Sequence, residues 1–142
     1  MILAQAFFPE GHPHFEVFND AKPHYESSPM PRTRRAVFLD RDGTLIEEGE
    51  YLHRPEDVRI FPGTGAALRQ LSEAGFALFI VSNQSGVGRG YFTMADVENV
   101  HRHLCAELER EGVKFTKIYV APEAPDQPSR GRKPSPGADR MA

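Results

Sequence analysis

The residues best suited to chemistry are Asp40 and Asp42, two carboxylates that follow the apolar run Ala36–Leu39 and precede Gly43. In an extended backbone, side chains two residues apart point the same way, and Gly43 allows the chain to turn sharply after them. Open α/β sheets bind ligands at the carboxyl ends of their strands, which is where this pair would lie. An aspartate-rich turn that only closes the strand is the other interpretation, because Asp and Gly are common turn residues.

Two further polar groups follow later apolar runs. Ser82 and Asn83 come directly after the second run, and Arg132 and Lys133 lie in the loop after the third. Together these groups suit phosphoryl transfer, in which one carboxylate attacks phosphorus, a second handles the leaving-group proton, and donors hold the phosphoryl oxygens. Because a carboxylate and a phosphate dianion repel each other, a divalent ion is needed between them, and Mg²⁺ prefers such oxygens.

Three strands must carry these groups. Apolar runs at residues 36–39 and 76–81 are continuous, which is typical of strands that are buried on both faces of a parallel sheet. Residues 115–120 form the third predicted strand. The polar groups follow the ends of these strands, so one edge of the sheet would collect all of them. The loop from Ala121 to Ser135 is rich in proline and brings Arg132 and Lys133 to that edge.

Helical patterns separate the strands. One helix is predicted from Thr64 to a terminating Gly75, and another from Thr93, with Asp96 as its capping-box partner, to Gly112. The alternating order predicts an α/β fold, a Rossmann-like parallel sheet with flanking helices. Residues 45–61 are too irregular for a helix and are interpreted as a flap over the end of the first strand.

The composition is that of one ordinary domain. The chain has 142 residues, of which 39% are hydrophobic and 26% charged, and its net charge of −3 argues against nucleic acid as the main partner. Cys105 is the single cysteine, so we expect a reduced cytoplasmic compartment and a packing role for this residue. The apolar start at residues 1–8 is too short for a signal peptide or membrane span, so we expect no membrane association.

The first 33 residues have a different character. They carry five prolines and three histidines (His12, His14 and His24) and show no sustained period of 2 or 3.6. This composition is typical of an extension, so we expect residues 1–33 to be poorly ordered and the domain to occupy residues 34–142. The histidine spacing matches no metal-ligand pattern.

Three motifs together resemble the haloacid dehalogenase (HAD) superfamily of phosphatases, whose first signature is an apolar strand followed by Asp-x-Asp-Gly-Thr. The matching stretches are residues 38–44, 81–86 and 132–137, and the likeness covers residues 34–137. In detail they look like the D-glycero-D-manno-heptose 1,7-bisphosphate phosphatase branch and the related histidinol-phosphate phosphatases.

The resemblance implies a role for each site residue. Asp40 would be the nucleophile that forms an aspartyl-phosphate, and Asp42 the general acid and base. Asp40 and the backbone carbonyl of Asp42 would bind Mg²⁺. Ser82 and Asn83 would hold the transferring phosphoryl group, and Lys133 would neutralise it. The implied substrate-binding set is Asp40, Arg41, Asp42, Glu48, Gly49, Glu50, Tyr51, Ser82, Asn83, Gln84, Ser85, Arg132 and Lys133.

Two departures from the family pattern alter these expectations. The branch usually holds a structural zinc through Cys-Pro-His and Cys-x-Cys, where this chain has Ala121–Glu123 and Ser129–Gly131, so no zinc is expected. The family also places a further strand and an acidic loop, which supplies the last Mg²⁺ carboxylate, well after its lysine. This chain ends at Ala142, and Asp126 and Asp139 lie in other contexts, so we expect a domain that lacks its C-terminal part.

The preferred interpretation is a Mg²⁺-dependent, monomeric phosphomonoester hydrolase that acts on a small phosphorylated metabolite, most simply a sugar bisphosphate. Histidinol-phosphate phosphatase and polynucleotide 3′-phosphatase are rivals within the enzymes, and the second is disfavoured because the chain has no basic stripe interleaved with aromatic residues. An inactive fragment or phosphate-binding module is the rival from another class, favoured by the missing acidic loop.

Overall fold

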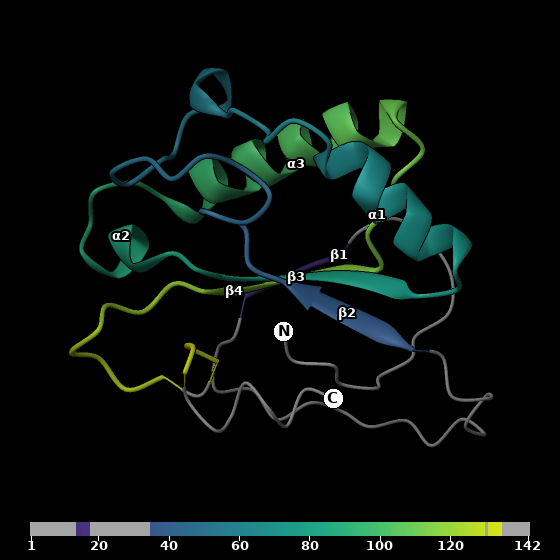
Figure 1. Cartoon of the computed structure of the whole chain (residues 1–142). Coiled ribbons are helices and arrows are strands. Elements are labelled where there is room, and N and C mark those ends of the chain that lie inside the picture. Colours follow the sequence, from purple (N-terminus) through teal and green to yellow (C-terminus); the bar gives the residue numbers. More distant parts are fainter. Residues whose placement is uncertain (1–13, 18–34, 130, 135–142) are drawn as a thin grey trace.

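A parallel sheet carries the site in the computed structural model, which describes residues 14–17, 35–129 and 131–134. The strands of this described part are β1 (His14–Val17), β2 (Ala36–Leu39), β3 (Ala77–Asn83) and β4 (Lys117–Ala121), all parallel and in the order β1-β4-β3-β2 (Figure 1). The three predicted core strands and the parallel α/β architecture are therefore confirmed. The order also puts β2, the strand that leads into Asp40, at one edge of the described sheet.

Three strands differ from the prediction. β4 begins at Lys117 and ends at Ala121, where residues 115–120 were predicted. β3 runs on to Asn83, so Ser82 and Asn83 belong to the strand and pair with Val120 and Ala121 of β4 instead of following the strand. β1 was not predicted at all, because its alternation of polar and apolar residues lasts for only four residues in a proline-rich stretch, too short to reveal a strand. It lies beside β4 in the register His14 to Lys117.

Some predicted features lie outside the described residues. They are the remainder of the N-terminal extension with His12 and His24, Arg34 at the start of the family likeness, and the end of the chain from Ser135 with Asp139.

Two long helices cover one face of the sheet. α1 (Thr64–Glu73) and α3 (Met94–Arg110) both lie above β3 and β4 in Figure 1. The predicted capping box of α3 is present, with the Thr93 hydroxyl accepting from the Asp96 amide and the Asp96 carboxylate accepting from the Thr93 amide. Gly75 follows α1 with a φ of 85°, as its predicted role in ending the helix requires. A short helix, α2 (Ser85–Gly88), was not predicted.

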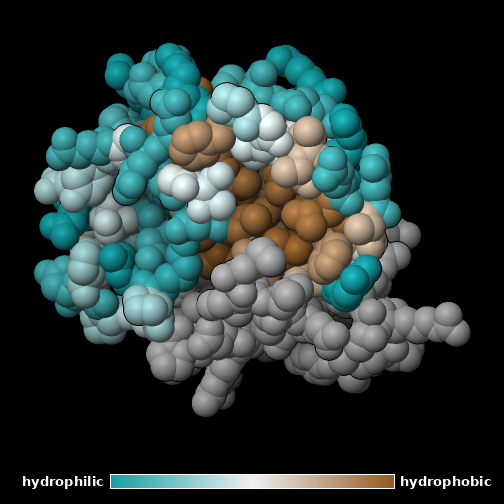
Figure 2. Space-filling model, viewed as in Figure 1, coloured by the Kyte–Doolittle hydropathy of each residue, from teal (hydrophilic) through white to brown (hydrophobic). Residues whose placement is uncertain are grey.

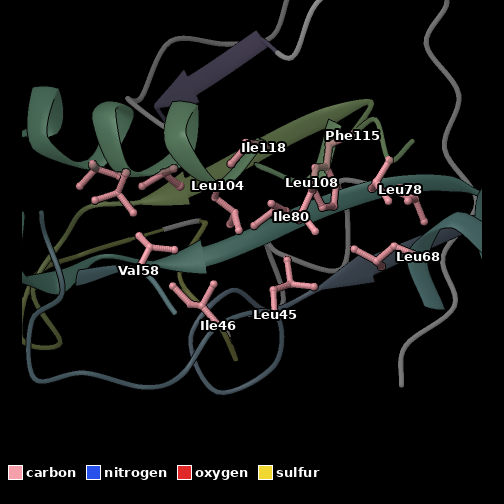
Figure 3. Close-up of a cluster of buried hydrophobic side chains, with 14 of the residues drawn as sticks. Leu45, Ile46, Val58, Leu68, Leu78, Ile80, Leu104, Leu108, Phe115 and Ile118 are labelled. Carbon is pink, nitrogen blue, oxygen red and sulfur yellow. The ribbon is translucent and has the colours of Figure 1, made fainter. Parts of the chain in front are cut away.

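The core between this helical face and the sheet is continuous (Figure 3). Leu104 and Leu108 of α3 meet Ile80 of β3 and Ile118 of β4, and all four are fully buried. Leu45 also points into this core, although it belongs to the segment interpreted as a flap. That segment is therefore anchored in the core at its start, and it contains the 3₁₀ helix η1 (Pro55–Asp57).

Apolar and polar residues occupy different parts of the molecule. Viewed from the side of Figure 1, apolar residues gather in the middle of the described part, and hydrophilic residues lie on its left and along its top (Figure 2). On the other face of the sheet a second cluster is buried, formed by Ala36, Phe79 and Tyr119, so both faces of the strands are apolar as predicted. None of the described helices combines the length and the apolar character that crossing a membrane requires.

Candidate active site

The Asp40–Asp42 turn is fixed by its own backbone. The carbonyl oxygen of Arg41 accepts from the amides of Leu45 and Ile46 at 2.9 and 3.2 Å, and the Gly43 amide donates to the carbonyl of Ile46 at 2.9 Å. Gly43 has a φ of 72°, a conformation that costs glycine little and other residues more, so its predicted role in a sharp turn is confirmed. The loop that carries both aspartates is thereby tied to two core residues.

Asp40 is the more open of the two carboxylates. Its side chain is 49% exposed, and its Oδ1 accepts from its neighbour's amide, that of Arg41, at 2.8 Å and from Lys133 Nζ at 2.7 Å. Lys133 comes from the loop after β4, so the structure brings together the predicted nucleophile and the predicted phosphate-neutralising cation. With one oxygen held by these donors, the carboxylate has a fixed orientation at the end of β2.

Asp42 is held by nitrogen donors at both of its oxygens. The Arg41 guanidinium donates from Nε to Oδ1 and Oδ2 at 3.2 and 3.0 Å and from Nη2 to Oδ1 at 2.9 Å. Gln84 Nε2 donates to Oδ2 at 3.0 Å. This bidentate pair is a geometry in which arginine binds carboxylates with orientation as well as charge.

Arg41 is buried although it was predicted to face the substrate. Its side chain is 1% exposed, and its Nη1 lies 3.4 Å from Nε2 of His101 on α3. Burial, and then the charge of Arg41, lower the pKa of His101 from 6.5 to about 3, so the imidazole is neutral at physiological pH. The described residues contain no group of three or more His, Cys, Asp or Glu side chains that could hold a metal ion.

The side chains at the end of β3 form hydrogen bonds to other residues of the protein. Asn83 donates from Nδ2 to the Lys133 carbonyl at 3.0 Å and accepts from the Lys133 amide at 2.9 Å. The Ser82 hydroxyl is buried and accepts from Gln84 Nε2 at 2.6 Å. In this structure Asn83 therefore holds the backbone of Lys133, and the phosphoryl-binding roles of Ser82 and Asn83 stay predictions.

The loop after β4 is closed by a second set of hydrogen bonds. Ser129 Oγ donates to the Glu123 carboxylate at 2.9 Å and accepts from the Arg132 amide at 3.0 Å, while Arg132 Nη1 donates to the Glu123 carbonyl at 3.0 Å. Glu123 and Ser129 occupy positions where the heptose bisphosphate phosphatase branch usually has zinc ligands. The guanidinium of Arg132 is thus turned to the loop, and its predicted contact with substrate stays a prediction.

Two adjoining clefts lie over these groups. The larger, of about 400 Å³, contains Asp40, Asp42, Glu48, Asn83, Lys133 and Pro134. The smaller, of about 200 Å³, shares three of these residues and adds Arg41, Gly49, Tyr51, Leu52, Gln84, Ser85, Gly86 and Phe92. Glu50, Ser82 and Arg132 line neither cleft, whereas the other predicted substrate-binding residues line at least one.

Several contributors to the site were not predicted. Phe92 lines the smaller cleft, and the ring of Tyr91 packs edge-on against Tyr51 with centroids 4.7 Å apart. An added Cβ on Gly86 would lie 2.1 Å from the Phe92 ring, so only glycine fits there. Tyr91 and Phe92 fall between a predicted polar cluster and a predicted helix, where the sequence carries no periodic signal that could have revealed them.

The oxygen groups fit a hard divalent cation. The Asp40 carboxylate lies in an open cleft, and no backbone hydrogen bond from a described loop residue ends on the carbonyl oxygen of Asp42. Carboxylate and carbonyl oxygens are what Mg²⁺ prefers, and it usually keeps several waters when few protein ligands are present. Asp40 and the Asp42 carbonyl could therefore supply two protein ligands of a Mg²⁺ ion, with water completing its coordination.

The fold and the site define a class. A carboxylate pair after the first core strand, a polar end on the next strand and a lysine after the third are the arrangement of the HAD-like phosphatases. The solved structure of D,D-heptose 1,7-bisphosphate phosphatase from B. bronchiseptica, complexed with magnesium and phosphate, superimposes with a TM-score of 0.70 at 30% identity, over 75% of this chain and 60% of that one.

The family follows from the sequence comparison. The family model described as polynucleotide kinase 3 phosphatase matches residues 35–142, and the chain belongs to this family. D-glycero-beta-D-manno-heptose-1,7-bisphosphate 7-phosphatases are 40% identical in Rhodopseudomonas palustris, over 73% of this chain, and 37% identical in Haemophilus ducreyi, over 77%. The chain spans 62% and 64% of these two relatives. The resemblance drawn from the motifs is thus confirmed.

Proposed function

We propose that this chain is a Mg²⁺-dependent phosphomonoester hydrolase that acts on a small phosphorylated metabolite, with a sugar bisphosphate as the preferred substrate. The observation that carries the proposal is the position of Asp40, whose half-exposed carboxylate lies in the larger cleft with Lys133 Nζ 2.7 Å away. A nucleophile beside a fixed cation is what attack on an anionic phosphoryl group requires.

Each residue then has a step in the reaction. Asp40 attacks phosphorus and forms an aspartyl-phosphate while the bond to the leaving oxygen breaks. Asp42 gives a proton to that oxygen and later takes one from the water that hydrolyses the intermediate. Lys133 offsets the charge of the phosphoryl oxygens. Asp40 and the Asp42 carbonyl would hold Mg²⁺, whose charge would reduce the repulsion between carboxylate and phosphate.

The substrate class rests on the relatives and on charge. The curated relatives are named heptose bisphosphate phosphatases, whereas the family description names polynucleotide 3 phosphatase. Among the described residues, Lys133 is the one basic residue that lines the larger cleft, beside the carboxylates of Asp40, Asp42 and Glu48, so the cleft lacks the clustered Lys and Arg that bind a polynucleotide backbone. A compact sugar bisphosphate is the better match. We also propose that the protein is cytoplasmic and acts as a monomer.

The test is phosphate release across a Mg²⁺ titration. A heptose bisphosphate, histidinol phosphate and a 3′-phosphorylated oligonucleotide would each be offered to the wild type, to Asp40→Asn and to Asp57→Asn. Asp57 is an exposed carboxylate of η1 paired with Arg54, so its variant controls for loss of charge alone. We expect release from the sugar bisphosphate only at elevated Mg²⁺, abolished in Asp40→Asn and retained in Asp57→Asn.

Three results would overturn this proposal. Equal rates in the wild type and Asp40→Asn would mean that Asp40 is not the nucleophile. Binding of inorganic phosphate without turnover of any substrate would identify a phosphate-binding module instead, and faster release from the oligonucleotide would identify a polynucleotide phosphatase.

A further inference from the structure

Arg41 is the largest fully buried side chain among the described residues, although it lies between the two aspartates of a solvent-open turn. Removing a guanidinium from water costs several kcal/mol unless its donors are matched by acceptors. Two of its nitrogens are matched by the Asp42 carboxylate. The third, Nη1, points towards α3, where the acceptor is the imidazole of His101.

His101 is well suited to accept this bond. It is 0% exposed, and its neighbours on α3, Val97, Val100 and Leu104, are at most 1% exposed, so the helix holds the ring in the core. A neutral imidazole with its proton on Nδ1 presents Nε2 as an acceptor, which a guanidinium with five donors requires. The ring and the guanidinium therefore form a buried contact between the central part of α3 and the site.

We propose that Arg41 and His101 are positioning residues for Asp42, the acid and base of the reaction proposed above, on which this inference rests. An arginine side chain has several rotatable bonds, and its pair with Asp42 fixes only one end of the guanidinium. The contact with His101 fixes the other end. The Asp42 carboxylate, which Gln84 also holds at Oδ2, is thereby tied through Arg41 to α3, 60 residues away in the sequence.

A positioning role and simple packing predict different effects when His101 is replaced. If His101 only filled space, an apolar side chain of similar size would replace it without changing the proton-transfer step. If it positions Arg41, loss of the acceptor lets the guanidinium rotate and moves the Asp42 carboxylate with it. Small displacements of a catalytic group slow the chemical step more than they weaken substrate binding.

The experiment compares His101→Leu with His101→Gln, which keeps an acceptor oxygen, and with His103→Leu, a histidine on the same helix that lines neither cleft. We expect kcat to fall about tenfold in His101→Leu with KM changed by less than about twofold, because misplacement of a catalytic group costs on the order of 10- to 100-fold. His101→Gln should recover most of the loss, and His103→Leu should match the wild type. Thermal melting would confirm that each variant is folded at the assay temperature.

A second measurement separates this inference from the proposed function. The side-chain Nε–H of Arg41, observed by ¹⁵N NMR on the full chain, should exchange slowly with water in the wild type and in His103→Leu, and rapidly in His101→Leu. A slow signal in folded His101→Leu would overturn the positioning role whether or not the protein is active. In an active protein, unchanged kcat in His101→Leu, or equal losses in His101→Leu and His101→Gln, would overturn it as well. A wild type without phosphatase activity would overturn only the proposed function.

Discussion

The acidic and basic sides of the site are anchored in different ways. The acidic side, Asp40 to Asp42, follows a core strand, and Leu45 and Ile46, which close its turn, are at most 2% exposed. The basic side, the loop from Ala121 to Lys133, is held near Lys133 by hydrogen bonds from Asn83 and, further back, by the Glu123, Ser129 and Arg132 set.

This difference predicts how each side responds to mutation. Burial of large apolar side chains contributes about 1.5 to 3 kcal/mol each, whereas a hydrogen bond contributes a net of roughly 0.5 to 1.5 kcal/mol. The acidic side is thus fixed by the same interactions that stabilise the fold. The basic side can lose its position while the fold remains intact, so its variants should lose activity without losing stability.

Among variants that keep the Asp40 nucleophile, the largest effect is expected on the acidic side, from Asp42→Asn. The amide keeps the shape of the side chain but cannot transfer a proton, so kcat should fall by roughly 10²- to 10⁴-fold with a smaller change in KM. Steady-state phosphate release measures both constants. A rise in KM with kcat unchanged would show that Asp42 binds substrate and does not act as acid and base.

The next effect is on stability and concerns His101, which contacts Arg41 on the acidic side. The pKa of His101 is lowered to about 3 in the folded protein, so the unfolded chain binds a proton first as the pH falls below 6.5. The free energy of unfolding should therefore fall by up to about 1.4 kcal/mol per pH unit between pH 6.5 and 3. Urea unfolding at pH 7 and pH 5 measures this slope, which should be shallower in His101→Leu. Equal slopes in the two proteins would contradict a buried neutral His101.

A smaller effect is expected where the two sides meet. Asn83→Ala removes both hydrogen bonds to the Lys133 backbone, and kcat/KM should fall about tenfold, as expected from the loss of roughly 1.4 kcal/mol. The melting temperature should change little. Asn99→Ala, on the exposed face of α3, is the matched control. A large loss of stability in Asn83→Ala would mean that the Lys133 loop is part of the cooperative core.

The smallest effect is expected from Ser129→Ala. This variant removes one bond to Glu123 and one from the Arg132 amide, but the two bonds between Asn83 and the Lys133 backbone remain. Activity should fall about threefold, because a partly exposed hydrogen bond contributes only about 0.5 to 1 kcal/mol. Ser72→Ala on α1 serves as the control. Loss of activity larger than in Asn83→Ala would place the anchor of the basic side in the Glu123 and Ser129 pair.

The same difference explains what the sequence could predict. β2, α1, α3 and the Asp40–Gly43 turn were predictable because continuous apolar runs, caps and a glycine each have a local physical signal. The contact between Arg41 and His101 was not, since a charged residue in a polar motif gives no sign that it is buried. Nor was β1, whose four residues are held by pairing with β4. Partners distant in the sequence leave no periodic pattern.

The most direct test is to trap the covalent intermediate. Wild type, Asp40→Asn and Asp57→Asn would be mixed with sugar bisphosphate and Mg²⁺, quenched in acid and digested, and the peptides examined by mass spectrometry. We predict that one phosphoryl group is attached to Asp40 in the wild type and in Asp57→Asn, and that none is found in Asp40→Asn. A phosphoryl group on another residue, or turnover by the wild type with no adduct on Asp40, would contradict the assignment of Asp40 as the nucleophile.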